Sequence, residues 1–165
     1  MIDKRIQLTL FTDPKQSESI EGIRKKFNPI QYELIKSHVT FCREDELGNL
    51  EDVFKIFMKT HHPPIVINFG KAMRFAEDKG VLLPAVGENI GFYELRKLIL
   101  PSSTSINKSN PHITLMHPRN STCTDVMFEQ IKMIKLPGKL EFIKVSLIEQ
   151  VMGKKWNILK EFQLQ

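Results

Sequence analysis

The sequence lacks several features that would assign it to a class at once. Its 165 residues contain no run of 18 or more apolar residues, and the first ten positions, MIDKRIQLTL, already carry charge. Neither a membrane helix nor a signal peptide is therefore predicted. The two cysteines, Cys42 and Cys123, have no CxxC spacing and are typical of reduced structural thiols rather than a disulfide framework. We expect a cytoplasmic protein with no membrane partner.

Signals of a metal site or of a protein that coats RNA are also missing. The net charge of +5 would attract polyanions, but the chain has no RNP-like aromatic strand and no arginine-rich tail. His61 and His62 are adjacent in an extended segment, where neighbouring side chains point apart, and no Cys, Asp or Glu lies at ligand spacing. We expect a surface turn there rather than a metal site.

The chain does have enough apolar residues to form a core, and its first residues follow the patterns of a strand and a helix. The hydrophobic fraction of 41% suits one compact domain over residues 1–165. Alternation over 5–12 predicts a strand with one face in the core. The Asp-Pro pair at 13–14 is interpreted as the N-cap and first position of a helix over 14–27, with Gln16 completing a capping box.

The remaining elements are predicted from alternation, helical spacing and turn residues. They are a strand over 37–43, a helix capped by Asn49, two or three antiparallel strands in PPIVINFGKAMRFAEDKGVLLPAV, a helix through Ile90, Tyr93, Leu95 and Leu98, a polar loop over 101–111, a strand in HITLMH, a helix capped near Thr122 or Thr124, and a closing hairpin of KLEFIKVSLIEQV and KKWNILKEFQL turned at MGKK. The predicted fold class is α+β, with antiparallel sheet and helices packed outside.

One phrase occurs twice in this order. HVTF at 38–41 and HITL at 112–115 each place His, an apolar residue, Thr and a second apolar residue in a strand that a capped helix follows. The repetition indicates an internal duplication and favours two pseudo-two-fold related lobes, with the two phrases facing each other across a central cleft.

Residues i and i+2 of a strand share a face, so His38 lies with Thr40 and His112 lies with Thr114. If the lobes face each other, two imidazoles and two hydroxyls converge. A neutral imidazole can accept a proton and an imidazolium can donate one on opposite sides of a phosphorus atom, while hydroxyls donate to the non-bridging oxygens. The pattern therefore favours phosphodiester chemistry with a bell-shaped pH profile over two structural histidines bonded to the backbone.

The paired tetrapeptides resemble the 2H phosphoesterase superfamily, most closely its RNA 2′,3′-cyclic phosphodiesterases, also named 2′-5′ RNA ligases. The likeness extends over IQLTLF, GVLLPAVGENIGFYELRKLI and NILKEFQL, and so over nearly the whole chain. It implies one bilobal domain that needs no metal and no cofactor. It also implies that His38 is the proton donor, His112 the proton acceptor that activates water, and Thr40 and Thr114 the phosphate ligands. We further expect a monomer.

The sequence departs from the RNA group at one position. Many members carry arginine two residues after the second tetrapeptide, where this chain has His117, so small nucleotides become plausible substrates beside RNA ends. His117 is interpreted as a loop residue in preference to a third phosphate contact. Four cations flank the two phrases and could either draw phosphate inward or be solvated: Lys36, Arg43, Lys108 and Arg119. Three aromatic residues are interpreted as core: Phe92, Tyr93 and Trp156.

The function that these observations favour is the opening of 2′,3′-cyclic phosphates of RNA ends or nucleotides to 2′-phosphates by a metal-independent phosphodiesterase. Two alternatives remain open at this point. One is cleavage or ligation of 2′-5′ linked oligonucleotides by the same four side chains. The other is a non-catalytic module that binds a nucleotide or RNA.

Overall fold

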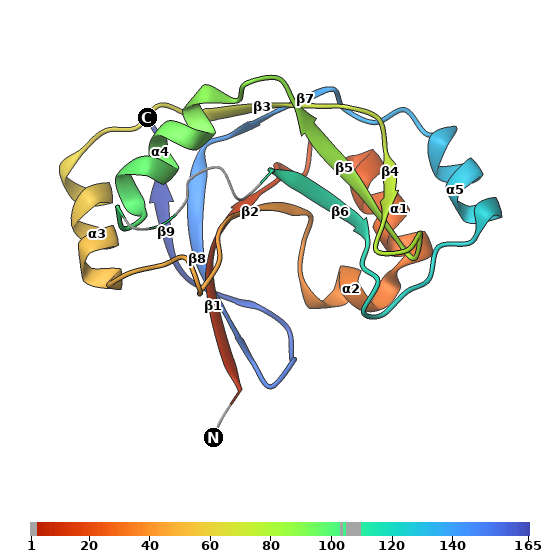
Figure 1. Cartoon of the computed structure of the whole chain (residues 1–165), viewed down its shortest axis with the longest axis horizontal. Coiled ribbons are helices and arrows are strands. Elements are labelled where there is room, and N and C mark those ends of the chain that lie inside the picture. Colours follow the sequence, from red (N-terminus) through yellow and green to blue (C-terminus); the bar gives the residue numbers. More distant parts are fainter. Residues whose placement is uncertain (1–2, 103, 105–109) are drawn as a thin grey trace.

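The computed structural model describes residues 3–102, 104 and 110–165, which form an antiparallel sheet flanked by helices (Figure 1). The elements of this described part are β1 (Lys4–Phe11), α1 (Glu18–Phe27), α2 (Pro29–Leu34), β2 (His38–Cys42), α3 (Leu50–Lys59), β3 (Ile65–Phe69), β4 (Met73–Phe75), β5 (Gly80–Val86), α4 (Ile90–Ile99), β6 (His112–Met116), α5 (Asp125–Lys132), β7 (Lys139–Phe142), β8 (Lys144–Val151) and β9 (Asn157–Gln163). Their strand order is β7-β3-β5-β6-β2-β1-β8-β9, with β4 paired to β5.

The sheet consists of two halves that meet between β2 and β6. One half contains β7, β3, β5 and β6, and the other contains β2, β1, β8 and β9. The two halves join through the pairing of Val39 with Ile113. Figure 1 shows α3 and α4 at one end of the molecule and α1, α2 and α5 at the other. The predicted α+β class, an antiparallel sheet with helices outside, is confirmed, and the two halves belong to one continuous sheet.

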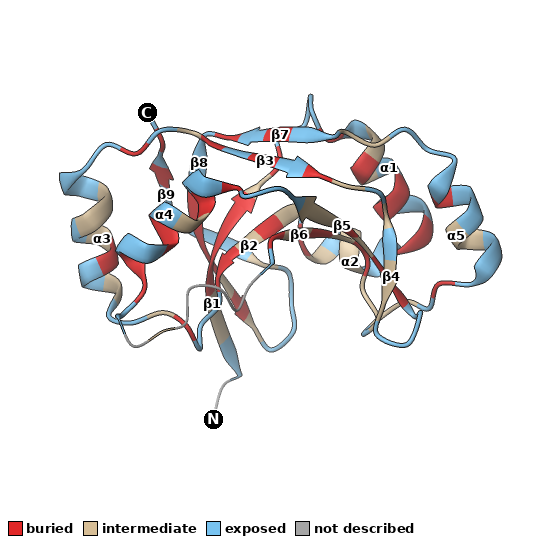
Figure 2. Cartoon of the chain, turned by 45° about the horizontal axis from the view of Figure 1, so that its top comes forward, coloured by how far each residue is buried: buried red, intermediate tan, exposed pale blue. Residues whose placement is uncertain are grey.

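β2 and β6 have the same burial pattern, in which His and Thr are half-buried and the intervening residues are buried (Figure 2). Val39, Phe41, Ile113 and Leu115 are at most 1% exposed. Alternate side chains of a strand point to opposite faces. The apolar residues therefore hold both strands on the core, and this leaves the polar residues on the opposite face.

The first helix is shorter than predicted. It begins at Glu18, after Ser17, instead of at residue 14. The carboxylate of Asp13 accepts a hydrogen bond of 2.8 Å from the backbone N–H of Lys15 and closes a local turn. Gln16 forms no capping box, since its side-chain oxygen accepts from the backbone N–H of Glu141. Asp commonly makes such a turn in competition with a helix start, and this is why the prediction over 14–27 was wrong at its beginning.

The fourth helix was predicted, but only part of its buried face. Phe92 and Leu95 are buried as expected, whereas Ile90 and Leu98, which belong to the same predicted apolar spacing, are 57% and 56% exposed. The buried residues of α4 are Phe92, Leu95, Arg96 and Ile99. The sequence prediction considered only apolar residues for the buried face and therefore missed Arg96. Arg96 is nevertheless buried, because it donates to the backbone oxygen of Phe41 and pairs with Glu46 at 2.8 Å.

The closing hairpin differs from the prediction in its first strand. KLEFIKVSLIEQV is divided at Ile143 into β7, which pairs with β3, and β8, which pairs with β1 and β9. The turn at MGKK is confirmed. Met152 and Gly153 have φ values of +50° and +68°, and the N–H of Lys154 donates to the oxygen of Val151 at 3.1 Å. Two successive residues with positive φ are the signature of a type I′ hairpin turn.

Other local predictions are confirmed by the contacts they required. The side chain of Asn49 caps α3 by accepting from the N–H of Glu51, and Thr124 caps α5 by accepting from the N–H of Met127. The segment 65–86 forms three antiparallel strands. Most of the polar loop predicted over 101–111, with Lys108, lies outside the described residues. None of the helices that the structure describes has the length and apolar content to cross a membrane.

Candidate active site

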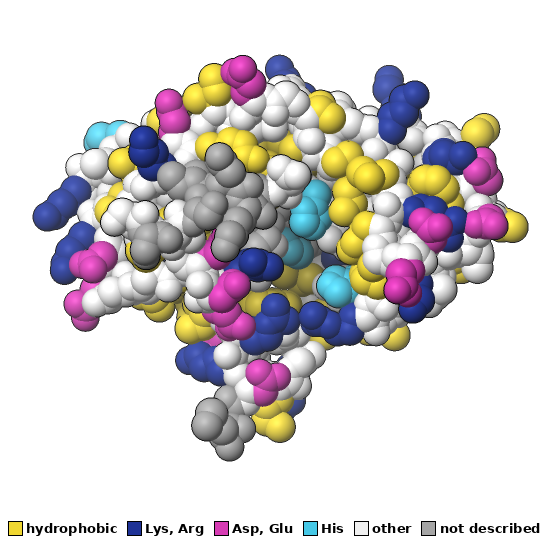
Figure 3. Space-filling view, in the orientation of Figure 1, with side chains coloured by type: hydrophobic (Ala, Val, Ile, Leu, Met, Phe, Trp, Pro, Cys, Tyr) yellow, Lys and Arg dark blue, Asp and Glu magenta, His cyan; other side chains and the backbone are white. Residues whose placement is uncertain are grey.

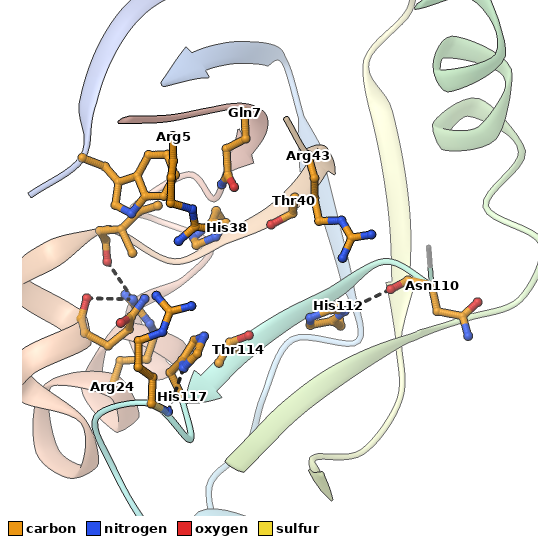
Figure 4. Close-up of a pocket in the computed structure, with 14 residues that line it drawn as sticks. Arg5, Gln7, Arg24, His38, Thr40, Arg43, Asn110, His112, Thr114 and His117 are labelled. Atoms are coloured by element: carbon orange, nitrogen blue, oxygen red, sulfur yellow. Dashed lines mark hydrogen bonds between the residues drawn. The ribbon is translucent and has the colours of Figure 1, made fainter. Parts of the chain in front are cut away.

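A cavity of about 360 Å³ opens on the polar face of β2 and β6 (Figure 4). Histidine side chains surround a hollow in the middle of this face, with Lys and Arg side chains beside them (Figure 3). Among the described residues that line the cavity none is acidic: Arg5, Gln7, Arg24, Gln31, Ile35, His38, Thr40, Arg43, Asn110, His112, Thr114, His117, Arg119 and Trp156. Because cations in a concave site focus a positive potential, the lining favours an anionic ligand.

The two predicted histidines lie in this cavity with the same local geometry. The Nδ1 atom of His38 is 2.8 Å from the backbone oxygen of Lys36, and that of His112 is 3.0 Å from the backbone oxygen of Asn110. A carbonyl oxygen only accepts, so each Nδ1 carries a proton and donates it. In the neutral form, both rings therefore keep an unprotonated Nε2, which is the atom that can accept a proton.

The two threonines accompany the histidines as strand alternation predicts. Thr40 is opposite Thr9 of β1, and Thr114 is opposite Leu82 of β5. In Figure 4, Thr40 lies between His38 and Arg43, and Thr114 lies between His112 and His117. The structure thus brings the four predicted side chains, which come from separate parts of the sequence, to one cavity instead of two separate cores.

The surroundings of His38 favour its neutral form. Burial, as the largest cause, and the charges of Arg24, His112 and His117 together lower the pKa of His38 to about 4, although the hydrogen bond to Lys36 raises it. The imidazole is therefore uncharged at neutral pH. An anion in the cavity would act in the opposite direction and raise this pKa.

His117 is a loop residue, as interpreted, but it also lines the cavity, so the loop position and a place at the cleft do not exclude each other. It follows β6 directly, and its backbone N–H donates to the side-chain oxygen of the buried Asn28 at 2.7 Å. Its Nδ1 accepts from the N–H of Arg119 at 3.1 Å, so the neutral ring carries its proton on Nε2. Burial, followed by the charges of Arg119 and Arg5, lowers the pKa of His117. His117 therefore presents a neutral N–H donor at neutral pH.

The arginines of the lining differ in their bonding. Arg24 is 1% exposed, and its guanidinium is 2.9 Å from the carboxylate of Glu21 and 2.7 Å from the backbone oxygen of Ile35, so it belongs to the wall. Arg43 makes a solvent-exposed ion pair with Asp45 at 3.3 Å. Exposed pairs of this kind are weak and easily exchanged. The Arg43 guanidinium can therefore turn to an anion in the cavity.

The predicted flanking cations divide accordingly. Arg43 and Arg119 line the cavity with the histidines. Lys36 lines two neighbouring hollows of the surface instead. Lys108 lies outside the described residues.

Trp156 was interpreted as core and is instead part of the cavity lining. It lies just before β9, where the guanidinium carbon of Arg5 is 5.4 Å from the centroid of the indole ring. Arg5 and Gln7 also line the cavity, and the sequence interpretation missed them. Because Arg5 and Gln7 alternate along β1, the sequence could have predicted that they share a face. That this face lies beside Thr40 could not be predicted without knowing that β1 pairs with β2.

His61 is exposed, but His62 is buried, so the surface turn expected for this pair was wrong at His62. The Nε2 of His62 is 2.6 Å from the hydroxyl of Thr60, and its ring is edge-on to Phe57. Within the described part of the chain, no group of three or more His, Cys, Asp and Glu could hold a metal ion. Cys42 and Cys123 are free and buried. Burial raises the pKa of Cys42 to about 12, and thiols of this kind are unreactive.

Comparison with known proteins adds similarity in fold. No family model and no curated protein sequence matches the chain. Among solved structures, E. coli LigT in complex with phosphate aligns with a TM-score of 0.65 at 17% identity, over 100% of this chain and 99% of LigT. The chain has the fold of LigT. A protein described as a phosphoesterase aligns with a TM-score of 0.62 at 15% identity over 99% of each chain, and TT0787 of Thermus thermophilus with 0.54 at 13% over 97% of each.

The LigT comparison confirms, for the fold, the resemblance that the two tetrapeptides indicated. The alignment spans 100% of this chain and 99% of LigT. At this level of identity the alignment establishes architecture and leaves the roles of individual side chains to be argued from the cavity itself.

Proposed function

We propose that this protein is a 2H phosphoesterase that opens 2′,3′-cyclic phosphates of RNA ends or nucleotides to 2′-phosphates without a metal ion. The proposal is carried by one observation: His38 and His112 line the same cavity, and each donates from Nδ1 to a backbone carbonyl and keeps Nε2 for proton exchange. Solved complexes of LigT with phosphate, NADP+ and 3′-AMP support an anion of nucleotide size as the ligand.

In the proposed reaction, the oxygen of water attacks phosphorus and the bond from phosphorus to O3′ breaks. Nε2 of His112 accepts the proton of the attacking water, and Nε2 of His38 gives a proton to O3′. The product is the 2′-phosphate, and both groups must lie on opposite sides of phosphorus because the displacement is in line. Thr40 and Thr114 donate hydrogen bonds to the two non-bridging oxygens, whose charge must be held through the transition state.

The donor role of His38 depends on the substrate. Burial and neighbouring cations hold the pKa of His38 at about 4, so it has no proton to give at neutral pH. The negative charge of the phosphodiester raises this pKa when it enters the cavity. The substrate therefore completes the catalytic acid.

A substrate analogue with sulfur in place of O3′ tests this assignment, because a thiolate leaves without needing a proton. The His38→Ala variant should regain most of its rate with this analogue, and His112→Ala should not. Recovery in His112→Ala alone would reverse the two roles.

The proposed activity is tested by product analysis. The protein is incubated in EDTA with 2′,3′-cyclic AMP or with RNA that ends in a cyclic phosphate, and the products are separated by chromatography. We expect 2′-phosphates. Absence of product from every cyclic phosphate, across mildly acidic and neutral pH, would overturn the proposal.

The same assay separates the alternatives. Cleavage or joining of 2′-5′ linked oligoadenylates with no action on cyclic phosphates would indicate the oligonucleotide activity. Binding of a nucleotide without any product would indicate a non-catalytic module. We also propose that residues 1–165 act as a single domain in a monomer, which light scattering of the purified protein checks.

A further inference from the structure

A second cavity adjoins the one that holds the histidines. Its volume is about 330 Å³, and it shares Arg5, Gln7, Arg43 and Trp156 with the first cavity. Cavities that bind small molecules usually have volumes of about 300 Å³ or more. The shared wall means that a ligand with its phosphate between the histidines can extend along β1 into the second cavity.

Trp156 is fixed at this junction by its backbone. It belongs to the hairpin that connects β8 and β9, and its N–H donates to the carbonyl oxygen of Leu34 at the end of α2, at a distance of 3.0 Å. The indole is half-buried. The hairpin therefore holds a large aromatic ring beside the cavity and leaves part of its surface open to a ligand.

Arg5 adds a cation to this ring. Its guanidinium carbon is 5.4 Å from the indole centroid, within the range of a cation–π interaction. Its ion pair with Glu44 is long, at 3.8 Å, and exposed, so it holds the guanidinium weakly. Aromatic side chains such as indole, and the guanidinium plane of arginine, stack on a nucleobase irrespective of its identity.

We propose that Trp156 and Arg5 form a nucleobase subsite, on which the base of a nucleotide or of the terminal residue of an RNA stacks while its phosphate lies between His38 and His112. The inference rests on the proposed function for the position of the phosphate. It adds that the substrate carries its base toward β1 and the β8–β9 hairpin, and that the subsite accepts any of the bases.

A purely structural role for Trp156 makes a different prediction. In that case the indole only anchors the hairpin on α2, and its loss lowers stability and affects all ligands equally. The two roles are separated by comparing ligands that differ only in the presence of a base.

The first test is fluorescence, because Trp156 is the single tryptophan of the sequence. The wild-type protein is titrated with 2′-AMP and with the 2-phosphate of methyl riboside, which has no base. We expect saturable quenching by 2′-AMP and none by the base-free phosphate. Equal responses to both ligands would overturn the subsite.

The second test is steady-state kinetics with 2′,3′-cyclic AMP and with the 2′,3′-cyclic phosphate of methyl riboside. Loss of a stacking aromatic weakens binding by roughly 5- to 150-fold, and we expect Trp156→Ala to raise KM for cyclic AMP within this range. KM for the base-free substrate should be unchanged. Trp156→Phe should retain most of the affinity because phenylalanine still stacks.

A matched control is Leu159→Ala, which removes an exposed apolar side chain of β9 that lines neither cavity. Its kinetics should equal those of wild type with both substrates. An equal rise of KM for both substrates in Trp156→Ala, with a lowered melting temperature, would assign Trp156 to the structural role and overturn the proposal. Base-dependent quenching without turnover of any cyclic phosphate would support the subsite and refute the proposed function.

Discussion

The two histidine strands, β2 and β6, are alike within the strand and different around it. Both place His and Thr on one face, bury the intervening residues and hold the imidazole by the carbonyl oxygen two residues earlier. The third residue after Thr, however, is Arg43 on one side and His117 on the other. Local sequence repeats therefore set the position of the four polar groups, whereas residues outside the repeats make the two sides chemically unequal.

The difference matters for proton transfer. The ring of His38 is beside that of Phe11, at 6.1 Å between centroids, and the charge of Arg24 acts on it. His112 is on the other side of the cavity, where its strand neighbour is Pro84. An acid and a base must differ in their surroundings even if their own geometry is the same. Substitution of equivalent residues in β2 and β6 measures how unequal the two sides are.

The largest effect is expected from the histidines themselves. Replacing His38 or His112 with Ala should lower turnover by on the order of 10² to 10⁴ each, the range of general acid–base groups. Because the two act in one step, the double variant should lose little more than the worse single variant. The exposed His61→Ala serves as the control and should have wild-type turnover. Full activity in either single variant would remove that strand from the mechanism.

The threonines test whether the two strands hold the phosphate equally. Thr40→Val and Thr114→Val remove one hydroxyl each and keep the shape of the side chain. We expect each to lower kcat by roughly 10² to 10³, by analogy with lost oxyanion donors. A loss confined to one variant, measured with the same substrate and pH, would show that only one strand binds the reacting oxygens.

Arg43 and His117 test the inequality of the two sides. A charged donor binds an anion about 1 kcal/mol more tightly than a neutral one, or roughly fivefold. His117→Arg should therefore lower KM for 2′,3′-cyclic AMP roughly fivefold, and Arg43→His should raise it by a similar factor. Protonation of His117 in mildly acidic solution should tighten wild-type binding, and His117→Arg should remove this contribution and leave only that of His38. Unchanged KM in both variants would separate these side chains from the ligand.

The smallest effect is a dependence of stability on pH. In the unfolded chain His38 titrates near 6.5, and in the folded protein its pKa is about 4. Between these values the unfolded chain binds more protons, so stability falls as pH drops from 6.5 towards 4. For this half-buried group we expect about 2 kcal/mol of acid-induced loss that His38→Gln does not show. Denaturant unfolding over this range measures it, and parallel curves for both proteins would contradict the assigned pKa.

The sequence predicted those parts of the site that depend on short-range pattern. The alternation in HVTF and HITL placed His38, Thr40, His112 and Thr114 on polar faces, because a strand leaves no other arrangement for buried Val39 and Ile113. The residues that were missed or misplaced depend on pairings far apart in the chain. Trp156 and Arg5 meet only because β1 pairs with β8, whose hairpin docks on α2.

Two errors in the elements arise from polar side chains, one through a long-range partner and one through a local turn. Arg96 is on the buried face of α4 because its partner Glu46 follows β2, fifty residues earlier. The first helix begins late because the side chain of Asp13 closes a turn that competes with the cap. Apolar periodicity identifies a helix but contains no information about which charged residue has a buried partner.

In the proposed mechanism, two imidazoles from the two halves of the sheet stand on opposite sides of one phosphorus atom. A crystal structure with a nucleoside vanadate, which mimics the in-line transition state, shows whether they do. We predict Nε2 of His38 and Nε2 of His112 each within roughly 2.6–3.2 Å of opposite apical oxygens of the vanadate. A complex in which only one of the two rings contacts the vanadate, or in which both contact the same apical oxygen, would rule out the paired-histidine mechanism.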